Sequence, residues 1–328
     1  MAADFPFEPL FRHPHLQTIL GYLWPRDGAE RRFPLERKFY RTEPQVQVLV
    51  ESQRPAANPS GHIVMVHGLE GSGQSGYVRG LSRAGLDAGF AVHRFHLRTC
   101  GRTERLCPTL YHAGLTSDLV SVLRQLEAEA RAPMFLVGFS LGGNVALKLA
   151  GELGIEALPL LRGVCAVSTP LDLGACARRI AQRENWIYER RLVGHMRRRL
   201  RATGRYGRAA LSGLRSIADV DEHITAPSFG FGSAANYYQT QSAARYLAGI
   251  RVRALVIQAK DDPMVPFDSC QPEALGRNPH IEHWVTQHGG HLGFLGRKPH
   301  RFWVEDAILT WMLRVLGGER PANFKPKA

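Results

Sequence analysis

The chain has 328 residues, of which 44% are apolar and 22% charged, with 33 Gly and 20 Pro. These proportions describe one large globular domain, or a domain with a sizeable insertion, and they exclude a disordered, collagen-like or disulfide-stapled protein. The formal net charge is +13, but 36 of the 42 basic residues are Arg. A GC-rich coding sequence produces the same bias, so the charge alone does not predict nucleic-acid binding.

The cysteines and the first residues of the chain set the expected compartment. The five cysteines are odd in number and form no Cys-x-x-Cys pair, so we expect reduced thiols and neither a zinc ribbon nor a redox motif. His13 and His15 flank a proline with no third ligand nearby, so we interpret them as structural and not as a metal pair. The first twenty residues do not resemble a secretory signal, and no run of about 18 apolar residues occurs. We expect a cytoplasmic protein.

Apolar runs and helical patterns alternate through the first half of the chain. The patterns predict strands at 62–66, 91–95, 134–137 and 163–167 and helices at 77–88, 117–130 and 141–153. Regular alternation of strand and helix implies right-handed crossovers. We therefore predict an α/β fold with a mostly parallel sheet covered by helices on both faces.

The alternation stops between residues 170 and 250. This stretch is polar and rich in Arg, and it predicts a helical cap inserted over one end of the sheet. Strands at 253–259 and 281–286 and an amphipathic helix at 302–316 follow it. We therefore expect an α/β core made of residues 1–169 and 251–318, a helical cap at 170–250 and a C-terminal tail at 319–328.

The pentapeptide GFSLG, residues 138–142, lies between a predicted strand and the helix after it. A G-x-S-x-G string arises by chance about 0.15 times in a chain of this composition, so its position matters more than its letters. A serine hydroxyl becomes a good nucleophile when a tight turn raises it beside a base, and that turn leaves room only for Gly on either side. We predict that Ser140 is a nucleophile; the alternative is a serine that only caps the helix.

An activated serine also needs an imidazole base and a carboxylate that orients the imidazole. Asp262 follows the next-to-last predicted strand in KDDPMVP, and His291 follows the last one in the glycine-rich HGGHLGF. The order serine, acid, histidine is that of the α/β-hydrolase fold, which is the fold we predict. Asp261 and His288 are alternatives, but the D-x-x-V-P pattern and the Gly-Gly-His-x-Gly setting favour Asp262 and His291.

The sequence HGLEGS, residues 67–72, directly follows the first predicted strand. In this fold, an N–H from that loop and the N–H after the nucleophile bind the negative charge that develops on the carbonyl oxygen. We predict that the amides of Leu69 and Leu141 form this oxyanion hole. The alternatives are a simple turn or a phosphate-binding loop, but the segment lacks the spacing and the lysine of a P-loop.

Motifs along almost the whole chain resemble those of the YheT-like group of α/β-hydrolases. They are HPHLQTI, HGLEGS, FHLRTCG, LYHAG with Asp118, GFSLGGN, ITAPSFGFGSAANYY, AKDDP and HGGHLGF. The group is classed with the carboxylesterases and includes eukaryotic phospholipase-like proteins and yeast enzymes that make and hydrolyse medium-chain fatty-acid ethyl esters. The resemblance implies a serine esterase whose charge-relay residues are Ser140, Asp262 and His291.

Eleven arginines lie between residues 178 and 208, against only Glu184 and Glu189. One interpretation is a positive face of the cap that attracts anionic lipid headgroups or acidic substrates. The other is a solvated helical face whose apolar side chains turn toward the sheet. Those apolar side chains are Ile180, Trp186, Ile187, Leu192, Val193 and Met196.

Four aromatic residues of the predicted cap lie close together in sequence. Tyr237 and Tyr238, with Phe229 and Phe231, predict an aromatic cluster. Two interpretations stay open: the cluster lines an acyl pocket, or it belongs to the core.

The sequence as a whole predicts a serine carboxylester hydrolase that acts on short- or medium-chain esters through an acyl-enzyme. The alternatives are an acyltransferase that makes esters from an alcohol, or a lysophospholipid or phospholipid hydrolase. A non-catalytic anion-binding scaffold is least favoured, because no part of the triad is missing. We expect a small-molecule ester as partner, no nucleic acid and no cofactor or metal, with peripheral contact to an anionic membrane surface left open. We expect a monomer or weak oligomer.

Overall fold

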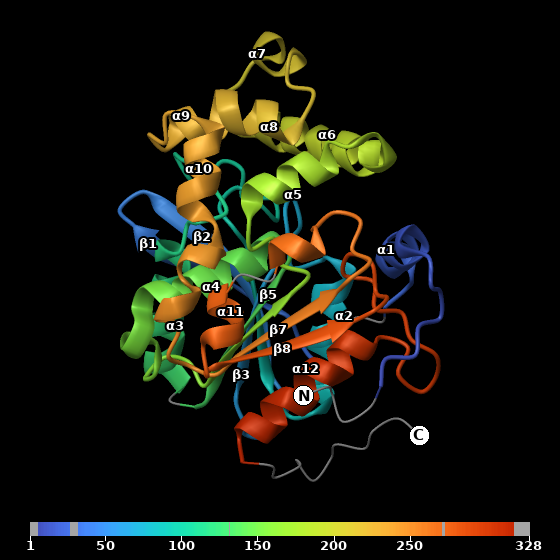
Figure 1. The fold of residues 1–328 in the computed structure, drawn as a ribbon. Coiled ribbons are helices and arrows are strands. Elements are labelled where there is room, and N and C mark those ends of the chain that lie inside the picture. Colours follow the sequence, from blue (N-terminus) through green and yellow to red (C-terminus); the bar gives the residue numbers. More distant parts are fainter. Residues whose placement is uncertain (1–5, 27–31, 131, 271–272, 318–328) are drawn as a thin grey trace.

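A sheet of eight strands in the order β1-β2-β4-β3-β5-β6-β7-β8 forms the centre of the structure (Figure 1). This computed structural model describes residues 6–26, 32–130, 132–270 and 273–317. Strands β3 to β8 are parallel, whereas β2 is antiparallel to both of its neighbours, so the mostly parallel sheet is confirmed. The strands are β1 (Glu36–Glu43), β2 (Val46–Gln53), β3 (His62–Val66), β4 (Ala91–Phe95), β5 (Met134–Phe139), β6 (Gly163–Val167), β7 (Ala254–Ala259) and β8 (Ile281–Thr286).

Helices cover both faces of the sheet, as predicted. Because side chains alternate along a strand, Ile63 and Met65 of β3 lie in one apolar cluster and Val64 and Val66 in another. The first cluster packs against α2 (Gly76–Asp87) and α12 (Trp303–Val315), the second against α3 (Ser117–Ala130) and α4 (Leu141–Leu153). Short helices η1 (Gly154–Ala157), η6 (Phe267–Cys270) and α11 (Glu273–Arg277) lie between these elements.

Three elements before residue 54 were not predicted: α1 (Pro14–Leu23) and the hairpin of β1 and β2. Strand β1 is the edge of the sheet, carries several charged residues and buries only Tyr40, so its apolar signal is weak. Helix α1 buries Gln17 and Thr18 and exposes most of its large apolar residues, which is the reverse of the usual pattern. A search for apolar periodicity therefore does not identify α1 or β1.

The segment between residues 170 and 250, all of which the structure describes, contains helices and no strand. They are α5 (Leu173–Ile180), η2 (Arg183–Asn185), α6 (Trp186–Ala202), α7 (Arg208–Ser212), α8 (Ile217–Val220), η3 (Asp221–Thr225), α9 (Ala226–Ser228), α10 (Ala234–Gln241), η4 (Ala243–Arg245) and η5 (Leu247–Gly249). Helices α5 to α9 lie beyond one end of the sheet in Figure 1, and most of them pack in a separate apolar cluster around Val193, Met196 and Leu200. The later helices pack on the main core, through Tyr237, Ala243 and Leu247. The limits of core and cap stay a prediction, and the tail at 319–328 lies outside the described residues.

Two apolar residues at the start of α6 lie on the surface and not against the sheet. If the arginine-rich stretch were only a solvated face, Trp186 and Ile187 would turn inward, but both side chains are exposed. Ile180, Val193 and Met196 are buried, yet they pack in the separate cluster of the helical segment and not on the sheet. The reason is geometric: Trp186 and Ile187 start α6, and the buried side of this helix begins at Tyr188.

Two observations limit what the described residues hold. None of their helices combines the length and the apolar character needed to cross a bilayer. All five cysteines are described, and all are free thiols.

Candidate active site

Ser140 lies in a strained turn between β5 and α4. Its φ of 52° is in the left-handed region, where a residue other than Gly costs on the order of 1–3 kcal/mol. A Cβ on Gly138 would lie 2.2 Å from the carbonyl oxygen of Gly142, and one on Gly142 would lie 2.3 Å from that of Val66. The backbone passes so close to both positions that only Gly fits, as we expected from the G-x-S-x-G pattern.

His291 lies between Ser140 and Asp262. Its Nε2 is 3.0 Å from Ser140 Oγ, and its Nδ1 is 2.8 Å from Asp262 Oδ2. The backbone N–H of His291 donates to Thr18 Oγ1 at 2.9 Å, and the next N–H, of Leu292, donates to Ser168 Oγ at 3.2 Å. Helix α1 and the end of β6 thus fix the loop that carries the imidazole.

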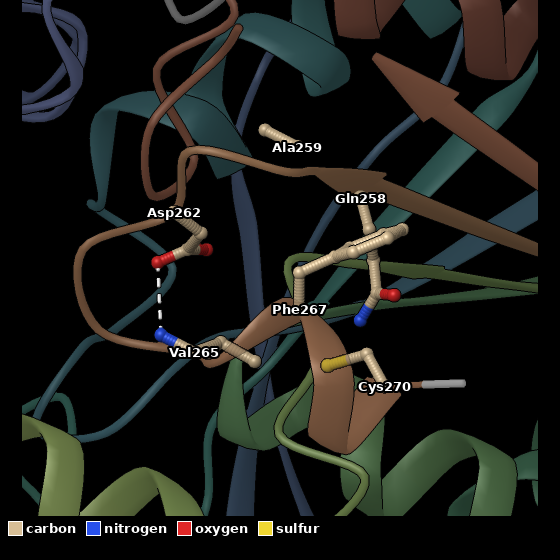
Figure 2. A pocket seen from close by; sticks show the side chains of 6 residues that line it. All are labelled: Gln258, Ala259, Asp262, Val265, Phe267 and Cys270. Carbon is tan, nitrogen blue, oxygen red and sulfur yellow. Dashed lines mark hydrogen bonds between the residues drawn. The ribbon is translucent and has the colours of Figure 1, made fainter. Parts of the chain in front are cut away.

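The other carboxylate oxygen of Asp262 is held by the backbone of its own loop. Asp262 Oδ1 accepts hydrogen bonds from the N–H groups of Met264 at 2.8 Å and Val265 at 3.0 Å. Figure 2 shows the bond to Val265 and the side chains that line a small pocket beside the carboxylate. The pocket is lined by Gln258, Ala259, Asp262, Val265, Phe267 and Cys270. The protein itself therefore fixes the orientation of Asp262.

The alternative residues form a second pair next to the first. His288 Nδ1 is 3.2 Å from Asp261 Oδ2, and Asp261 Oδ1 accepts the N–H of Gly290 at 2.9 Å. This pair braces the glycine-rich loop that precedes His291. The structure thus brings Asp262 and His291, and not Asp261 and His288, into the hydrogen-bonded chain that reaches Ser140.

The predicted oxyanion loop lies against Ser140. A Cβ on Gly68 would be 3.1 Å from the Cβ of Ser140, so Leu69 follows a residue in contact with the nucleophile. Among the hydrogen bonds between described residues, none uses the N–H of Leu69 or of Leu141. Neither amide therefore has a hydrogen-bond partner among the described residues, as the predicted role requires.

The loop is held by residues whose role the sequence analysis did not identify. His67 donates from Nδ1 to the carbonyl of Gly68 at 2.8 Å and accepts the N–H of Leu97 at Nε2 at 3.2 Å, which fixes its tautomer. Burial lowers the pKa of His67 to about 3, so the imidazole stays neutral. The hydroxyl of Tyr77 accepts the N–H of Gly68 at 3.0 Å.

An ion pair joins this loop to the helical segment. Arg199 of α6 donates from Nε to both carboxylate oxygens of Glu70, at 2.9 and 3.1 Å, and from Nη1 to Thr99 at 2.9 Å. Tyr111 stacks on the guanidinium at 4.7 Å, accepts the N–H of Glu70 and donates to its carboxylate. Both charged side chains are buried. Glu70 also has a positive φ of 55°, so the pair holds a strained residue directly after Leu69.

The same helical segment contacts the loop of Asp262. Asn185 donates to the carbonyl of Pro263 at 2.7 Å, and the thiol of Cys176 donates to the carbonyl of Met264 at 3.3 Å. The helical segment is therefore hydrogen-bonded to the loop of Asp262 as well as to the predicted oxyanion loop.

The aromatic cluster surrounds a buried histidine. The rings of Phe229, Phe231 and Tyr237 lie 4.5, 5.2 and 6.0 Å from that of His112, whose pKa burial lowers to about 3. Tyr237 is buried and its hydroxyl accepts the N–H of Ala113 at 2.9 Å. These contacts favour the core interpretation for Tyr237, whereas the two Phe are only half-buried.

His15 is hydrogen-bonded to the helical segment. His15 shares a hydrogen bond of 2.8 Å with the hydroxyl of Tyr188. Within the described residues, no three His, Cys, Asp or Glu side chains are grouped so that they could hold a metal ion. The interpretation of His15 as a structural residue is therefore supported by its bond to Tyr188.

The sheet order, the strained serine and the adjacent imidazole are the features of an α/β-hydrolase. The chain matches the model of the alpha/beta hydrolase family over residues 63–304. It is 34% identical over 318 residues to "Putative esterase YheT" of Escherichia coli, a match that covers 93% of this chain and 92% of that protein. The chain therefore belongs to the alpha/beta hydrolase family, and the predicted family, fold and hydrolase class are confirmed.

Two more distant similarities are informative. The chain is 25% identical over 262 residues to phospholipase ABHD3 of Mus musculus, covering 77% of this chain and 63% of that protein. A solved structure of the Pyrococcus furiosus esterase Pf2001 matches 88% of this chain and 96% of its own, with a TM-score of 0.59 and 18% identity. The second similarity supports the fold alone.

Arg199→Met tests the ion pair between α6 and the oxyanion loop. The variant leaves the Glu70 carboxylate buried without its cation, which typically costs about 3–5 kcal/mol. We expect the free energy of unfolding in urea to fall by about that amount. We also expect kcat for a short ester to fall roughly tenfold or more, because the Leu69 amide loses its fixed position.

Arg198→Met is the matched control, because Arg198 is the exposed neighbour on the same helix. It should change neither quantity measurably. If the Arg199 and Arg198 variants had equal stability and equal kcat, the ion pair would not position the loop.

Proposed function

We propose that the protein is a serine carboxylesterase that acts through an acyl-enzyme on short- or medium-chain esters. The observation that carries the proposal is the hydrogen-bonded chain from Ser140 Oγ through His291 to Asp262. The relation to YheT-type and phospholipase-type proteins supports an ester as the substrate class.

Acylation begins when Ser140 Oγ attacks the carbonyl carbon of the ester. His291 Nε2 lies at hydrogen-bonding distance and takes the serine proton, while Asp262 keeps the other ring proton on Nδ1 and stabilises the imidazolium. The amides of Leu69 and Leu141 bind the oxyanion, and each such donor contributes roughly 3–4 kcal/mol in the transition state. His291 then donates its proton to the leaving alcohol.

Deacylation repeats these steps with water as the nucleophile. His291 removes a proton from water, the hydroxide oxygen attacks the acyl carbon, and the proton returns to Ser140 as the acid leaves. Apart from the ester and water, these steps use only side chains and backbone amides of the protein.

Two alternatives keep the same acyl-enzyme. An alcohol in place of water would make the protein an acyltransferase, and a lysophospholipid or phospholipid would make it a lipid hydrolase. Adding ethanol during ester turnover and measuring the ratio of new ester to acid tests the first alternative. A series of acyl chain lengths and glycerophospholipids tests the second.

Ser140→Ala removes the proposed nucleophile. We expect kcat for a short p-nitrophenyl ester to fall on the order of 10⁴-fold or more, since the triad acts as a unit. Ser212→Ala is the control, because Ser212 is an exposed serine of α7. Turnover by purified, folded Ser140→Ala at the rate of the control variant would refute the proposal.

Asp262→Asn and Asp261→Asn compare the two neighbouring acids. Loss of the Asp262 carboxylate removes the charge that orients His291, so we expect kcat to fall about 10⁴-fold. Asp261 bonds Gly290 and His288, so its variant should keep kcat within roughly tenfold of the wild type. The reverse order of the two rates would assign the relay to Asp261.

A further inference from the structure

Helix α1 presents its apolar residues to solvent. Leu16 (45% exposed), Ile19 (37%), Tyr22 (58%) and Leu23 (63%) face outward, whereas its polar residues Gln17 and Thr18 are buried. A helix on the surface of a globular domain normally has the opposite arrangement. The outer face of α1 therefore has the character of an interaction surface.

The start of α6 extends this face. Trp186 (55% exposed) and Ile187 (51%) precede Tyr188, whose hydroxyl is bonded to His15 of α1. One turn after Ile187, Arg191 donates to the hydroxyl of Tyr22 at 2.5 Å and lies over its ring at 4.6 Å. The two helices are thus in direct contact.

We call this surface the α1/α6 face. It consists of Leu16, Ile19, Tyr22, Leu23, Trp186 and Ile187. Six of the eleven large apolar residues that are exposed in the described part of the chain belong to it, so the exposure is concentrated and not scattered.

Exposed arginines lie around this face. Arg12 precedes α1, Arg183 precedes α6, and Arg190 and Arg191 lie one turn after Trp186 and Ile187. The neighbouring Glu184 is paired with Arg179 and offers little free negative charge. Apolar and aromatic side chains surrounded by Arg match a surface with anionic headgroups above acyl chains.

We propose that the α1/α6 face docks the protein on an anionic lipid surface. Leu16, Ile19 and Leu23 enter the acyl region, and the rings of Tyr22 and Trp186 lie at headgroup level. A two-fold dimer through this face would press the same arginine-bordered surface of two copies together, which like-charge repulsion disfavours. Charge complementarity therefore selects lipid over a second copy.

The docking surface adjoins the active site. The buried side of α1 carries Thr18, which accepts the N–H of His291, and Gln17, which is bonded to both backbone groups of Leu295. An ester dissolved in the lipid would thus be presented beside the loop of His291. Binding itself does not depend on the proposed esterase activity, but its benefit to catalysis does.

Sedimentation of the full chain with vesicles tests the proposal. The vesicles are phosphatidylcholine alone or phosphatidylcholine mixed with phosphatidylglycerol, each at low and high salt. We expect strong binding only to the mixed vesicles at low salt. Arg190→Gln with Arg191→Gln should weaken it on the order of 25-fold, which is about fivefold for each arginine near an anionic surface.

The apolar part of the face has a matched control. Ile19→Ser with Leu23→Ser should weaken vesicle binding at least about tenfold, because two exposed apolar side chains no longer enter the bilayer. Ile155→Ser with Leu158→Ser removes two exposed side chains of the same types, Ile155 (73% exposed) in η1 and Leu158 (52%) after it, and should leave binding unchanged. All three double variants should hydrolyse a short soluble ester at the wild-type rate.

Several outcomes would overturn the proposal. Equal vesicle binding by the Ile19/Leu23 and Ile155/Leu158 variants would do so, as would equal binding to both lipid compositions. A dimer in light scattering that only the Ile19/Leu23 variant dissociates would assign the face to a second copy. Sedimentation requires no turnover, so vesicle binding of Ser140→Ala can be measured in the same way. Failure of the esterase proposal would appear in the turnover of the ester and not in vesicle binding.

Discussion

The hydrogen bond between His291 Nε2 and Ser140 Oγ is the contact around which the rest of the site is arranged. The two residues and Asp262 come from loops at the ends of β5, β7 and β8, which the parallel sheet brings to one edge. Each loop is then fixed separately. A strained turn between glycines fixes Ser140, two backbone amides fix Asp262, and Thr18 fixes the backbone of His291.

The elements outside the sheet take part in building the site. Helix α6 holds the predicted oxyanion loop through Arg199 and Glu70, and Asn185 holds the loop after Asp262. Helix α1 holds the loop of His291 with its polar side and exposes its apolar side next to the start of α6. A lipid surface that contacts this face would therefore lie one helix away from the loop that carries His291.

The sequence was sufficient for the parts of the structure that follow local rules. Buried strands such as β3 and β5 are short apolar runs, and Ser140 is identified by glycines that the turn requires. The choice of Asp262 over Asp261 rested on a pattern that includes Val265, whose amide bonds the carboxylate.

Other features depend on contacts that no local pattern contains. The Arg199–Glu70 pair joins residues that are 129 positions apart, and no local pattern around either residue predicts this contact. Helix α1 was not predicted because its apolar and polar residues are exchanged relative to the usual pattern. Trp186 and Ile187, which one of the two interpretations of the arginine-rich stretch turned inward, are exposed because they precede the buried side of α6. The exceptions to the pattern are thus the residues that form the α1/α6 face.

The most direct test of the central claim is covalent labelling with a fluorophosphonate, followed by mapping of the labelled peptide. The account predicts rapid, stoichiometric labelling at Ser140 in the wild type and labelling slowed by orders of magnitude in His291→Ala, because the serine is nucleophilic only beside its base. Labelling at another residue, or labelling of Ser140 at the same rate without the imidazole, would contradict it.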